Sequence, residues 1–582
     1  MFVRTSTRRN KDGSPVRYLQ LAHNEWDPAR KASRTKVVYN FGRAEELDRA
    51  GIERLIGALT RLLGTQPPAA GDQVAGLPGL EFAESRPVGG TWLLDQLWRT
   101  LHVDTSMTRL LAGTRRPESA ERVLFSLVAN RALAPSSKLA AAGWVSHDVH
   151  VPGLPEVSED ACYRAMDWLL QVEDTLAKNV YDSVADLLNL EVDLLFFDTT
   201  STHFQVEEAD IPAPRDVTGQ PLSGEDTDDA ATAATEVGFW TWGKSKDHRD
   251  DLPQVVIGMA VTRTGIPVRV WSWPGNTTDT ALIRQVKTDL RDWTLGKVIW
   301  VADRGFTSAA NRRALAAGAG GDILDEKLRS GSPEATAALS RPGRYATVAD
   351  NLRVKEVRIS EHERFVVCHN PDTADRDATI RADMVDKLRG LINDTDKLSE
   401  RQRAELRGVI STKPGLNRYL RVTPSGLLRL DAAAIAAEAK LDGKYLLRTS
   451  DPHLSAEDVA LGYKQLAAIE NAWRDMTHVI DLRPVFHRLE DRIRAHVLLC
   501  WLALLLIRIV ETRTGQTWHH LRPALQRLHV GTFTGPAGTY QQTTTPNTEA
   551  TAAFQALGLQ LPPKVLRLDT TTGPAKDSTP AA

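Results

Sequence analysis

The sequence predicts an α/β protein, and two short apolar runs are the main reason. Residues 192–197 (VDLLFF) lead directly into Asp198, and residues 298–302 (VIWVA) lead directly into Asp303. Apolar runs of this length, rich in β-branched and aromatic side chains, are typical of strands that are buried on both faces of a sheet. Between the two runs the pattern indicates a hairpin and then a helix. The order strand, hairpin, helix, strand favours a mixed sheet with helices on both of its faces.

The composition is that of an ordinary soluble globular chain. It has 582 residues, of which 25% are charged and 42% hydrophobic, and a formal net charge of −2 that neither indicates nor excludes a nucleic-acid partner. The charge is unevenly placed, because residues 1–65 hold thirteen Lys or Arg against seven Asp or Glu, whereas residues 206–236 hold nine acids against one base. The length predicts about three or four domains. The basic first segment is a candidate DNA-binding surface.

Three features predict a cytoplasmic protein without a membrane partner. Cys162, Cys368 and Cys500 are far apart and lack C-x-x-C spacing, which favours a reducing compartment and argues against a thiolate zinc site. The first residues lack the apolar stretch of a signal peptide. The longest apolar run, residues 497–507, is eleven residues long, which is too short to span a membrane and predicts a core helix.

A Pro- and Gly-rich stretch divides the first third of the chain. Residues 1–66 predict a small basic β-rich module, and residues 67–89 predict a linker. The elements expected in the module are strands at 16–22 and 36–42 and a helix at 45–63. Residues 90–190 carry apolar side chains at helical spacing behind suitable N-cap residues, which predicts a helical DNA-binding domain.

The α/β core is predicted in two parts, residues 191–326 and 445–530, separated by an inserted α+β domain at 327–444. The elements expected between the two aspartate-ended strands are a mobile acidic loop at 207–236, a hairpin of strands 254–262 and 267–273, a turn at 274–279 and a helix to 293. A helix at 308–317 and a strand at 322–324 follow Asp303. Residues 531–582 are expected to be a C-terminal tail.

The second part of the core is predicted to contain one long helix, capped by Ser455 and reaching His478. Its buried face is marked by Val459, Leu466, Ile469, Trp473 and Met476. Glu470 stands beside this apolar stripe, and a carboxylate directed there requires a cation or strong hydrogen-bond donors. Arg474, one turn later, supplies a cation under the plain structural interpretation. Under the functional interpretation the cation is a divalent metal shared with the two aspartates.

Asp198 and Asp303 are the other candidates for such a metal site. Side chains at the carboxyl ends of strands project into the crevice where open α/β sheets bind ligands. Two such strands side by side would bring two carboxylates together, and carboxylate oxygens are the ligands that hard divalent cations prefer.

Around these acids the sequence resembles the DDE insertion-sequence transposases of bacteria, which have a ribonuclease-H-like catalytic core. The resemblance extends from the N-terminal module through His496. The matching segments, in chain order, are 198–202 (DTTST), 243–249 (GKSKDHR), 274–279 (PGNTTD), 302–306 (ADRGF), 441–443 (LDG), 463–487 and 494–496. The resemblance implies a ribonuclease-H-like mixed sheet, with Asp198, Asp303 and Glu470 as the catalytic acids.

The family's helix signature is Y-x2-R-x3-E-x6-K, which places its tyrosine at Tyr463 and its acid at Glu470. Two positions depart from it, because Leu466 stands where arginine is usual and Thr477 where lysine is usual. These cations contact DNA phosphates in relatives. The departures leave the acid assignment unchanged, and Arg474 is the candidate to replace part of the missing charge.

The resemblance implies that the three acids bind two Mg²⁺ ions, which Mn²⁺ can replace, about 3.5–4 Å apart. Water as the nucleophile would cut the end of the element, and the freed 3′-hydroxyl would then join it to target DNA by in-line displacement. The expected partner is double-stranded DNA, namely terminal inverted repeats and target, with a homodimer acting on paired ends. The residues expected to contact DNA are Tyr463, Arg474, Lys244, Lys246, Arg249 and Arg304.

Each candidate also has a plain structural interpretation. Asp198 is followed by Thr-Thr-Ser-Thr and suits a turn cap, and Asp303 before Arg304 suits a surface ion pair. His203 suits a hydrogen-bonding neighbour better than a metal ligand. The acids at 490–491 are neighbours of Glu470 in sequence, but their spacing is typical of an intrahelical charge ladder.

Two further stretches keep two interpretations. The segment 243–249, flanked by Trp240 and Trp242, suits a solvated basic turn and a single-strand contact equally well. Trp271 and Trp273 alternate with Ser272, which predicts that at least one face of that strand is core. At the level of function, the alternatives to a transposase are a two-metal endonuclease without strand transfer and a DNA-binding relative that has lost catalysis.

Overall fold

The structure is a computed structural model. It describes residues 2–9, 15–27, 32–43 and 81–570, apart from short gaps at 191, 223–234, 292, 294, 296–297, 318–319, 330–331, 361–362 and 536–537. The chain forms two compact units, Met1–Glu81 and Phe82–Ala582.

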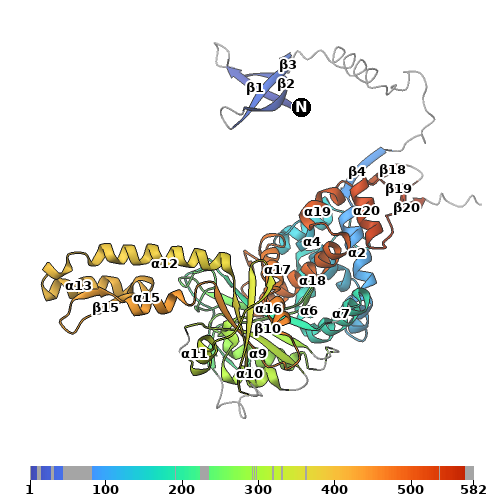
Figure 1. The fold of residues 1–582 in the computed structure, drawn as a ribbon. Coiled ribbons are helices and arrows are strands. Elements are labelled where there is room, and N and C mark those ends of the chain that lie inside the picture. Colours follow the sequence, from blue (N-terminus) through green and yellow to red (C-terminus); the bar gives the residue numbers. More distant parts are fainter. Residues whose placement is uncertain are drawn as a thin grey trace, which may run out of the picture. The chain divides into compact units, whose positions relative to one another are not determined.

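The first unit is a three-stranded antiparallel sheet in the order β1-β2-β3 (Figure 1). Its strands are β1 (Phe2–Arg9), β2 (Pro15–Asp27) and β3 (Ala32–Arg43). The strands expected at 16–22 and 36–42 are confirmed as parts of β2 and β3. The helix expected at 45–63 lies outside the described residues.

The second unit is built on a nine-stranded mixed sheet in the order β12-β13-β14-β17-β11-β10-β5-β8-β9. Its strands are β5 (Leu194–His203), β8 (Gln254–Thr262), β9 (Pro267–Pro274), β10 (Ile299–Ala302), β11 (Gly321–Glu326), β12 (Ala346–Ala349), β13 (Leu352–Ser360), β14 (Glu363–His369) and β17 (Lys444–Thr449). The central trio β5, β10 and β11 is parallel, and the remaining neighbours are antiparallel. This confirms the ribonuclease-H-like mixed sheet and the hairpin β8–β9.

Strand β5 differs from expectation in its length. It was expected to end at Asp198, but it continues to His203 and pairs with β8 along its whole second half. The polar residues after Asp198 look like a turn in the sequence, yet Thr199, Ser201 and Thr202 are buried because β8 and the segment before it cover them. Asp198 therefore lies inside a strand, at the point where the shorter neighbour β10 ends.

The two faces of the sheet carry different helices. Trp271 and Trp273 of β9 donate hydrogen bonds to Asp289 and Gln285 of α9 (Asp279–Asp289), so α9 covers the face on which these indoles lie. Side chains alternate along a strand, so Leu194, Asp198 and their cross-strand partners lie on the opposite face. Helix α16 (Ala456–Lys464) packs there, since Gly462 lies against Leu194 and Ile323.

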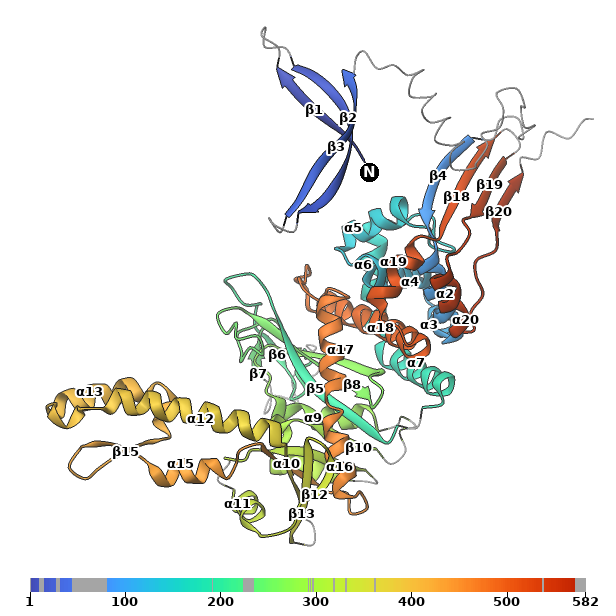
Figure 2. The same ribbon diagram turned by 45° about the horizontal axis from the view of Figure 1, so that its top comes forward.

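Helix α17 (Ala467–His478) contacts β5 and β8 beside α16 (Figure 2). The single long helix expected from Ser455 to His478 is therefore wrong: the chain leaves the helix at Gln465–Leu466 and begins a second one. Ser455 does cap the first helix, with a capping box to Asp458. Helix α10 (Ala309–Ala316) follows the short 3-10 turn Arg304–Phe306 and confirms the helix expected after Asp303.

The helical region surrounds one long buried helix, α18 (Glu490–Thr514). Its other helices are α2 (Gly89–Thr100), α3 (Val103–Leu111), α4 (Ala120–Leu133), α5 (Lys138–Gly143), α6 (Glu159–Gln171) and α7 (Glu173–Leu188). Among the described residues, α18 alone has the length and apolarity of a membrane span, and 94% of that window is buried inside the fold. This confirms the core helix.

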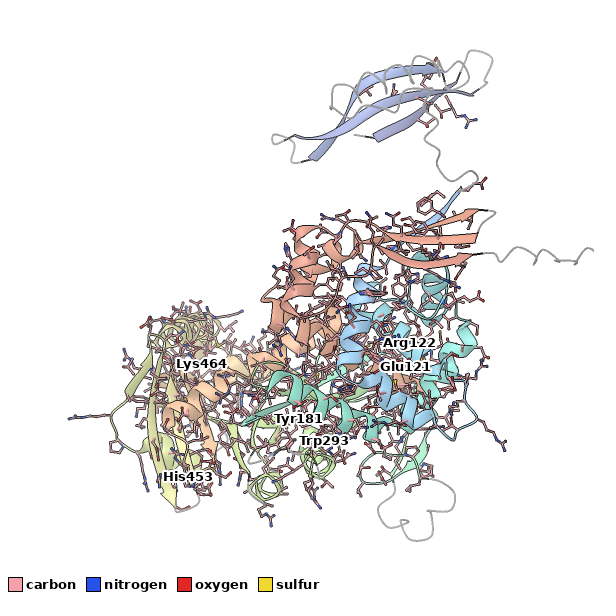
Figure 3. All side chains as sticks on the ribbon, turned by 90° about the vertical axis from the view of Figure 1, so that its right-hand side faces the viewer. Glu121, Arg122, Tyr181, Trp293, His453 and Lys464 are labelled. Atoms are coloured by element: carbon pink, nitrogen blue, oxygen red, sulfur yellow. The ribbon has the colours of Figure 1, made fainter. Side chains whose placement is uncertain are left out.

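Polar contacts and aromatic packing hold the helical region together and join it to the sheet. Arg122 forms ion pairs with Glu121 and Asp95 inside the bundle (Figure 3). Tyr181 of α7 packs against Trp293, which follows α9, with 5.2 Å between ring centroids. The bundle and the sheet thus share one hydrophobic core.

The inserted segment extends the sheet and then forms an arm with a small core of its own (Figure 2). Its elements after β11 are α11 (Pro333–Ser340), β12 to β14, α12 (Pro371–Ile392), α13 (Glu400–Ser411), α14 (Pro414–Asn417), β15 (Leu420–Val422), β16 (Leu428–Leu430) and α15 (Ala432–Ala439). Within the expected acidic loop, β6 (Ala213–Arg215) and β7 (Thr235–Val237) form a short ladder.

The end of the chain contains regular structure where a tail was expected. A second, four-stranded sheet has the order β20-β19-β18-β4. Its strands and accompanying helices are β4 (Glu81–Pro87), α19 (Trp518–Gln526), β18 (His529–Gly535), β19 (Gly538–Thr543), α20 (Thr548–Ala556) and β20 (Val565–Thr570). Strand β4 comes from the segment expected to be a linker. The division into domains stays a prediction.

Candidate active site

The strand register brings three aspartates to one level of the sheet. Ala302 of β10 pairs with Phe197 of β5 on one side and with Leu324 of β11 on the other. The residues that follow are Asp198, Asp303 and Asp325. Neighbouring strands lie about 4.8 Å apart, and the three residues share the face that α16 covers. The structure therefore brings Asp198 and Asp303 together as the sequence predicts, and adds Asp325.

The electrostatics of this row reflect carboxylates crowded together. The pKa of Asp198 is raised to about 6, chiefly by burial and to a smaller extent by the charges of Asp279 and Asp303, against the opposing effects of the Thr199 N–H and the Lys246 ammonium. Burial also raises the pKa of Asp325 to about 7, with Asp303 adding to the effect. Carboxylate oxygens that repel one another in a partly buried site are stabilised by a cation bound between them.

Asp303 is held by its own turn. It caps the 3-10 turn that follows β10, and one carboxylate oxygen accepts a hydrogen bond of 2.8 Å from the Arg304 N–H. The expected surface ion pair is not found for Asp303 in the described part of the chain. Arg304 itself is exposed.

Lys246 and Asp279 form a polar network beside Asp198. Asp279, the first residue of α9, accepts a hydrogen bond of 2.7 Å from the Thr199 hydroxyl and pairs with the Lys246 ammonium at 2.8 Å. The Lys246 N–H donates to the Ser201 hydroxyl at 3.0 Å. Gly305 lies against the Asp279 carboxylate, which a Cβ at this position would approach to 2.8 Å. This packing links the segments 243–249 and 274–279 to both aspartate strands.

The rest of the segment 243–249 forms a polar turn. Asp247 pairs with Arg483 at 2.7 Å, and Arg483 also donates to the Ser201 carbonyl of β5. His203 lies 3.9 Å from Asp247 and is a polar neighbour of this turn. Arg249 is bound to Asp251 at 2.8 Å.

Lys244 is exposed, and so is Trp242, at 48%. The indole of Trp240 is fixed by a hydrogen bond to the Arg488 carbonyl. The cations of this turn are divided between structural pairs, formed by Lys246 and Arg249, and solvent, to which Lys244 is exposed.

Glu470 does not lie with Asp198 and Asp303. It is exposed on the first turn of α17, which corrects the expectation that its carboxylate lies beside the apolar stripe. The stripe of α17 consists of Ile469, Ala472, Trp473 and Met476. A helix turns about 100° per residue, so Glu470 lies well round from the centre of this stripe. In the described residues no three His, Cys, Asp or Glu side chains form a group able to hold an ion.

The remaining signature positions surround Glu470. Tyr463 is half-buried at the end of α16, where burial and the charges of Asp325 and Asp303 raise its pKa above the usual value. Arg474 is exposed on α17, and no ion pair with Glu470 is found between these two described residues. Leu466 is half-buried against the core at the break between α16 and α17, where an apolar side chain is suited.

The neighbouring acid Glu490 has a structural role. It accepts two hydrogen bonds from Arg215, at 3.1 and 2.7 Å, and also pairs with Arg494 one turn along α18. The expected intrahelical pair is confirmed, with Arg215 added. Both Trp271 and Trp273 are buried, as the alternating pattern predicts, with their rings stacked 6.3 Å apart.

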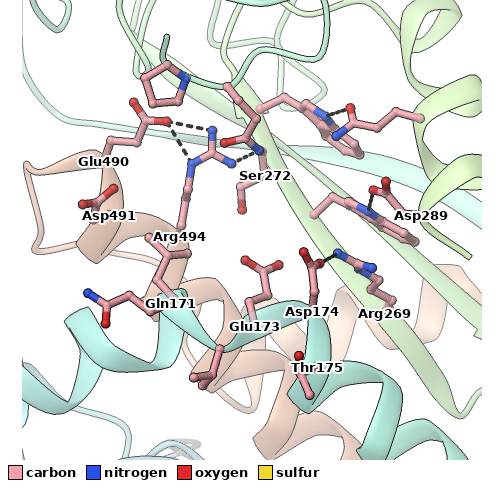
Figure 4. Close-up of a pocket in the computed structure, with 17 residues that line it drawn as sticks. Gln171, Glu173, Asp174, Thr175, Arg269, Ser272, Asp289, Glu490, Asp491 and Arg494 are labelled. Carbon is pink, nitrogen blue, oxygen red and sulfur yellow. Dashed lines mark hydrogen bonds and ion pairs between the residues drawn. The ribbon is translucent and has the colours of Figure 1, made fainter. Parts of the chain in front are cut away.

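A pocket at the outer edge of β9 is lined by Trp271, Trp273, Glu490 and Arg494 among others, and it lies away from the row of aspartates (Figure 4). Glu173 and Asp174 of α7, Arg269 of β9, and Arg494 line it together with the Trp271 and Trp273 indoles. Arg269 pairs with Asp174, and burial raises the pKa of Glu173 to about 7. Most of its charged groups are bound to one another, which indicates a structural junction between the bundle and the sheet.

Sequence reasoning missed Asp279 and Asp325. In the sequence, Asp279 was considered only as the start of the helix that follows the segment 274–279. The signal for a role in the site was its position as the first residue after a Thr cap, where a carboxylate points back from the helix. Asp325 follows the short strand-like stretch 322–324 (DIL), in which only Ile323 and Leu324 are apolar, so the pattern is weaker than the runs before Asp198 and Asp303. Its alignment with them depends on the pairing of β10 with β11.

Two family patterns match the chain. Residues 3–70 match the N-terminal domain of IS1634 family transposases, and residues 201–506 match the transposase DDE domain. The second match covers more than half of the chain, so the protein belongs to the DDE insertion-sequence transposases. It includes Asp303 and Glu470 and begins three residues after Asp198.

Two other comparisons add little to the family assignment. None of the curated proteins compared with the chain matches it. A solved structure described as the piggyBac transposase synaptic complex with hairpin DNA aligns with a TM-score of 0.36 at 11% identity, covering 76% of this chain and 82% of that one.

Proposed function

We propose that this transposase cuts the ends of an insertion element and joins the freed 3′-hydroxyl to target DNA by in-line phosphoryl transfer with two Mg²⁺ ions, using Asp198, Asp303 and Glu470. The observation that carries the proposal is the register of β5 and β10, which aligns the first two acids on neighbouring parallel strands. Family membership supplies the reaction class. We also propose that the protein acts as a homodimer on paired DNA ends in the cytoplasm.

The residues present suit a divalent cation. Asp198 and Asp303 offer hard carboxylate oxygens at one level of the sheet, and the charge of Asp303 is one of the causes that raise the pKa of Asp198. Lys246 supplies one positive charge nearby, but it is bound to Asp279. Bound cations would lower the pKa of the attacking hydroxyl or water and stabilise the leaving oxygen.

Residues of the chain itself would orient the substrate. Arg304, Lys244 and Arg474 are exposed cations, which suits contacts to phosphate. Arg304 directly follows Asp303, and Arg474 lies one turn after Glu470. Lys246 and Thr199 hold Asp279, and Arg483 ties the segment after α17 to β5. These contacts would keep Asp198 in a fixed position while the DNA is bound.

Glu470 is the third acid of the proposal although its side chain is exposed on α17. We propose that the break at Gln465–Leu466 lets α17 turn so that Glu470 approaches Asp198 and Asp303 when an element end is bound. Bringing an exposed carboxylate to a metal requires a shift of one short helix and breaks no ion pair of Glu470 found in the described residues.

The test is an assay of the purified full chain with labelled element ends, unlabelled target DNA and Mg²⁺. Wild type should give cut ends and joined products, and Asp198→Asn, Asp303→Asn and Glu470→Gln should each lower both by about 10³-fold or more while retaining DNA binding. Asp386→Asn, a matched change on the exposed arm, should leave both products unchanged. Cut ends without joining would identify an endonuclease, and DNA binding without cutting would identify an inactive relative.

The same assay separates Glu470 from Asp325 as the third acid. If Glu470→Gln kept full activity while Asp325→Asn abolished it, the family assignment of the third acid would be wrong and the row of three strand aspartates would be the functional set.

A further inference from the structure

Four basic side chains are buried together beneath the segment that follows α17. Arg131 of α4, Lys138 of α5, His487 and His496 of α18 are exposed by only 2%, 3%, 6% and 3%. They come from three helices and one loop, and none belongs to the proposed active site. Buried cations are normally found with a carboxylate partner, so the surroundings of this cluster require an explanation.

The four groups are close enough to influence one another. The rings of His487 and His496 have centroids 5.7 Å apart. The positive charges of Arg131 and Lys138 lower the pKa of both histidines, in addition to the larger effect of burial. Burial and the charge of Arg131 likewise lower the pKa of Lys138 to about 7.

The groups that face the cluster supply little negative charge. The thiols of Cys162 and Cys500 stay neutral at pH 7, because burial raises the pKa of each to about 11. Asp481 is exposed, and it offers Arg131 its backbone carbonyl at 3.2 Å in addition to a more distant carboxylate charge. Arg492, on the outer side of His487, adds positive charge.

Several nitrogen atoms of the cluster also lack hydrogen-bond partners among the residues that the structure describes. Arg131 uses one guanidinium nitrogen for the Asp481 carbonyl, whereas its Nε and its other terminal nitrogen are buried without a partner. His496 contacts the Leu482 carbonyl through Nε2, and its Nδ1 is buried without a partner. For Lys138, no hydrogen bond or ion pair is found within the described residues, although its ammonium nitrogen is not among the fully buried unpaired atoms. Unpaired buried donors such as those of Arg131 are suited to hold an ion or water.

We propose that Arg131, Lys138, His487 and His496 form a binding site for one small inorganic anion. The unpaired donors of Arg131 and Lys138 would bind it directly, and the histidines would take up protons as it binds. A water molecule accepts hydrogen bonds but leaves the positive charges uncompensated. An anion accepts hydrogen bonds and also supplies the compensating negative charge. Because proton uptake accompanies binding, affinity should rise as the pH falls from 8 to 6.

The position of the site would connect anion binding to the segment that follows α17. The segment from Asp481 to His487 is held on one side by Arg131 and His496 through its carbonyls, and on the other side Arg483 bonds to β5. This segment directly follows α17, which carries Glu470. A bound anion would stabilise the junction between the bundle and the core on which α17 depends.

The test measures thermal unfolding of the full chain in sodium gluconate progressively replaced by chloride, bromide or phosphate at constant ionic strength. For wild type we expect a saturable rise of the melting temperature of roughly 1–3 °C, larger at pH 6 than at pH 8. Lys138→Met should lose this dependence, whereas the matched exposed change Lys397→Met should keep it. Preference for chloride and bromide over phosphate would identify a monatomic anion, and the reverse a tetrahedral one.

An equal anion dependence in wild type and Lys138→Met, or none in wild type, would overturn the proposal. If Lys138→Met failed to fold, crystals of wild type grown with bromide would decide, because the proposal requires an anomalous peak beside Lys138 and Arg131. A map with bromide bound elsewhere and none at this cluster would refute it.

Discussion

The substitution Asp198→Asn is expected to stabilise the metal-free protein while abolishing its activity. In the folded chain the pKa of Asp198 rises from 3.8 to about 6, chiefly through burial and secondarily through the neighbouring carboxylates. A rise of about two pKa units corresponds to about 3 kcal/mol, at 1.36 kcal/mol per unit. Asparagine has the same shape and no charge, so at pH 7 it removes most of this unfavourable term.

The sign of the pH dependence follows from the same shift. A carboxyl group with a raised pKa binds its proton more tightly in the folded state than in the unfolded state. Its contribution to stability is therefore present at low pH and is lost as the pH rises from about 4 to about 6. Wild type should lose up to about 3 kcal/mol over this range relative to Asp198→Asn, and the two should be closest in stability near pH 4.

The assay is urea unfolding of both proteins between pH 4 and pH 8, with and without Mg²⁺. Added Mg²⁺ should stabilise wild type at pH 7 and have little effect on the variant, since the variant lacks one of the proposed ligands. If Asp198→Asn were less stable than wild type at pH 7, or if both responded equally to Mg²⁺, the reasoning about the carboxylate row would be refuted.

Three further outcomes follow from other parts of the structure. Lys246→Ala should reduce cleavage about 10–100-fold in the end-cutting assay, because it releases Asp279 from its ion pair beside the aspartates. Glu173→Gln should raise stability above pH 7 by up to about 3 kcal/mol and flatten the loss seen in wild type between pH 5 and 7, measured by urea unfolding, because burial raises the pKa of Glu173 from 4.5 to about 7. Gly258→Ala should destabilise the protein by about 1–3 kcal/mol in the same measurement, because its Cβ would lie 2.5 Å from the ring of Trp273.

Each of these outcomes has a control. Lys397→Ala breaks an exposed ion pair with Asp394 on the inserted arm, and equal losses for Lys397→Ala and Lys246→Ala would contradict a positioning role for Lys246. An unchanged pH profile in Glu173→Gln would exclude a raised pKa at this position. Gly408 has open space around its Cβ position, so Gly408→Ala should not destabilise the protein.

The parts of the fold that were predictable are those in which one residue pattern has one structural solution. The buried strands before Asp198 and Asp303 and the hairpin β8–β9 are short apolar runs bounded by turn residues. Helix α18 is apolar on all sides, which is typical of a helix surrounded by protein.

The parts that were not predictable depend on tertiary pairing. The polar second half of β5 resembles a turn in the sequence, and only its ladder with β8 makes it a strand. The sheet of β4 with β18 to β20 joins segments about 440 residues apart, so the sequence of neither segment indicates the strand with which it pairs. Glu470 was expected beside the apolar stripe because Leu466 was counted as part of the buried helix face, whereas Leu466 lies at the break before α17 and the stripe of α17 is Ile469, Ala472, Trp473 and Met476.

The alignment of Asp325 with the two predicted aspartates has the same origin. Its run of apolar residues is too short to identify a core strand, and the parallel pairing of β10 with β11 becomes visible only in the folded sheet. The family signature located Glu470 in the sequence, but the position of its carboxylate relative to Asp198 depends on where α17 begins.

The central claim, that Asp198 and Asp303 hold the catalytic metal, is tested most directly by mapping where a bound metal lies along the chain. Fe²⁺ substituted for Mg²⁺ with ascorbate and peroxide cleaves the backbone next to its binding site. The account predicts cuts near residues 198 and 303, an added cut near residue 470 when an element end is bound, and loss of all three in Asp303→Asn. Cuts elsewhere in the chain, or cuts that persist unchanged in Asp303→Asn, would contradict it.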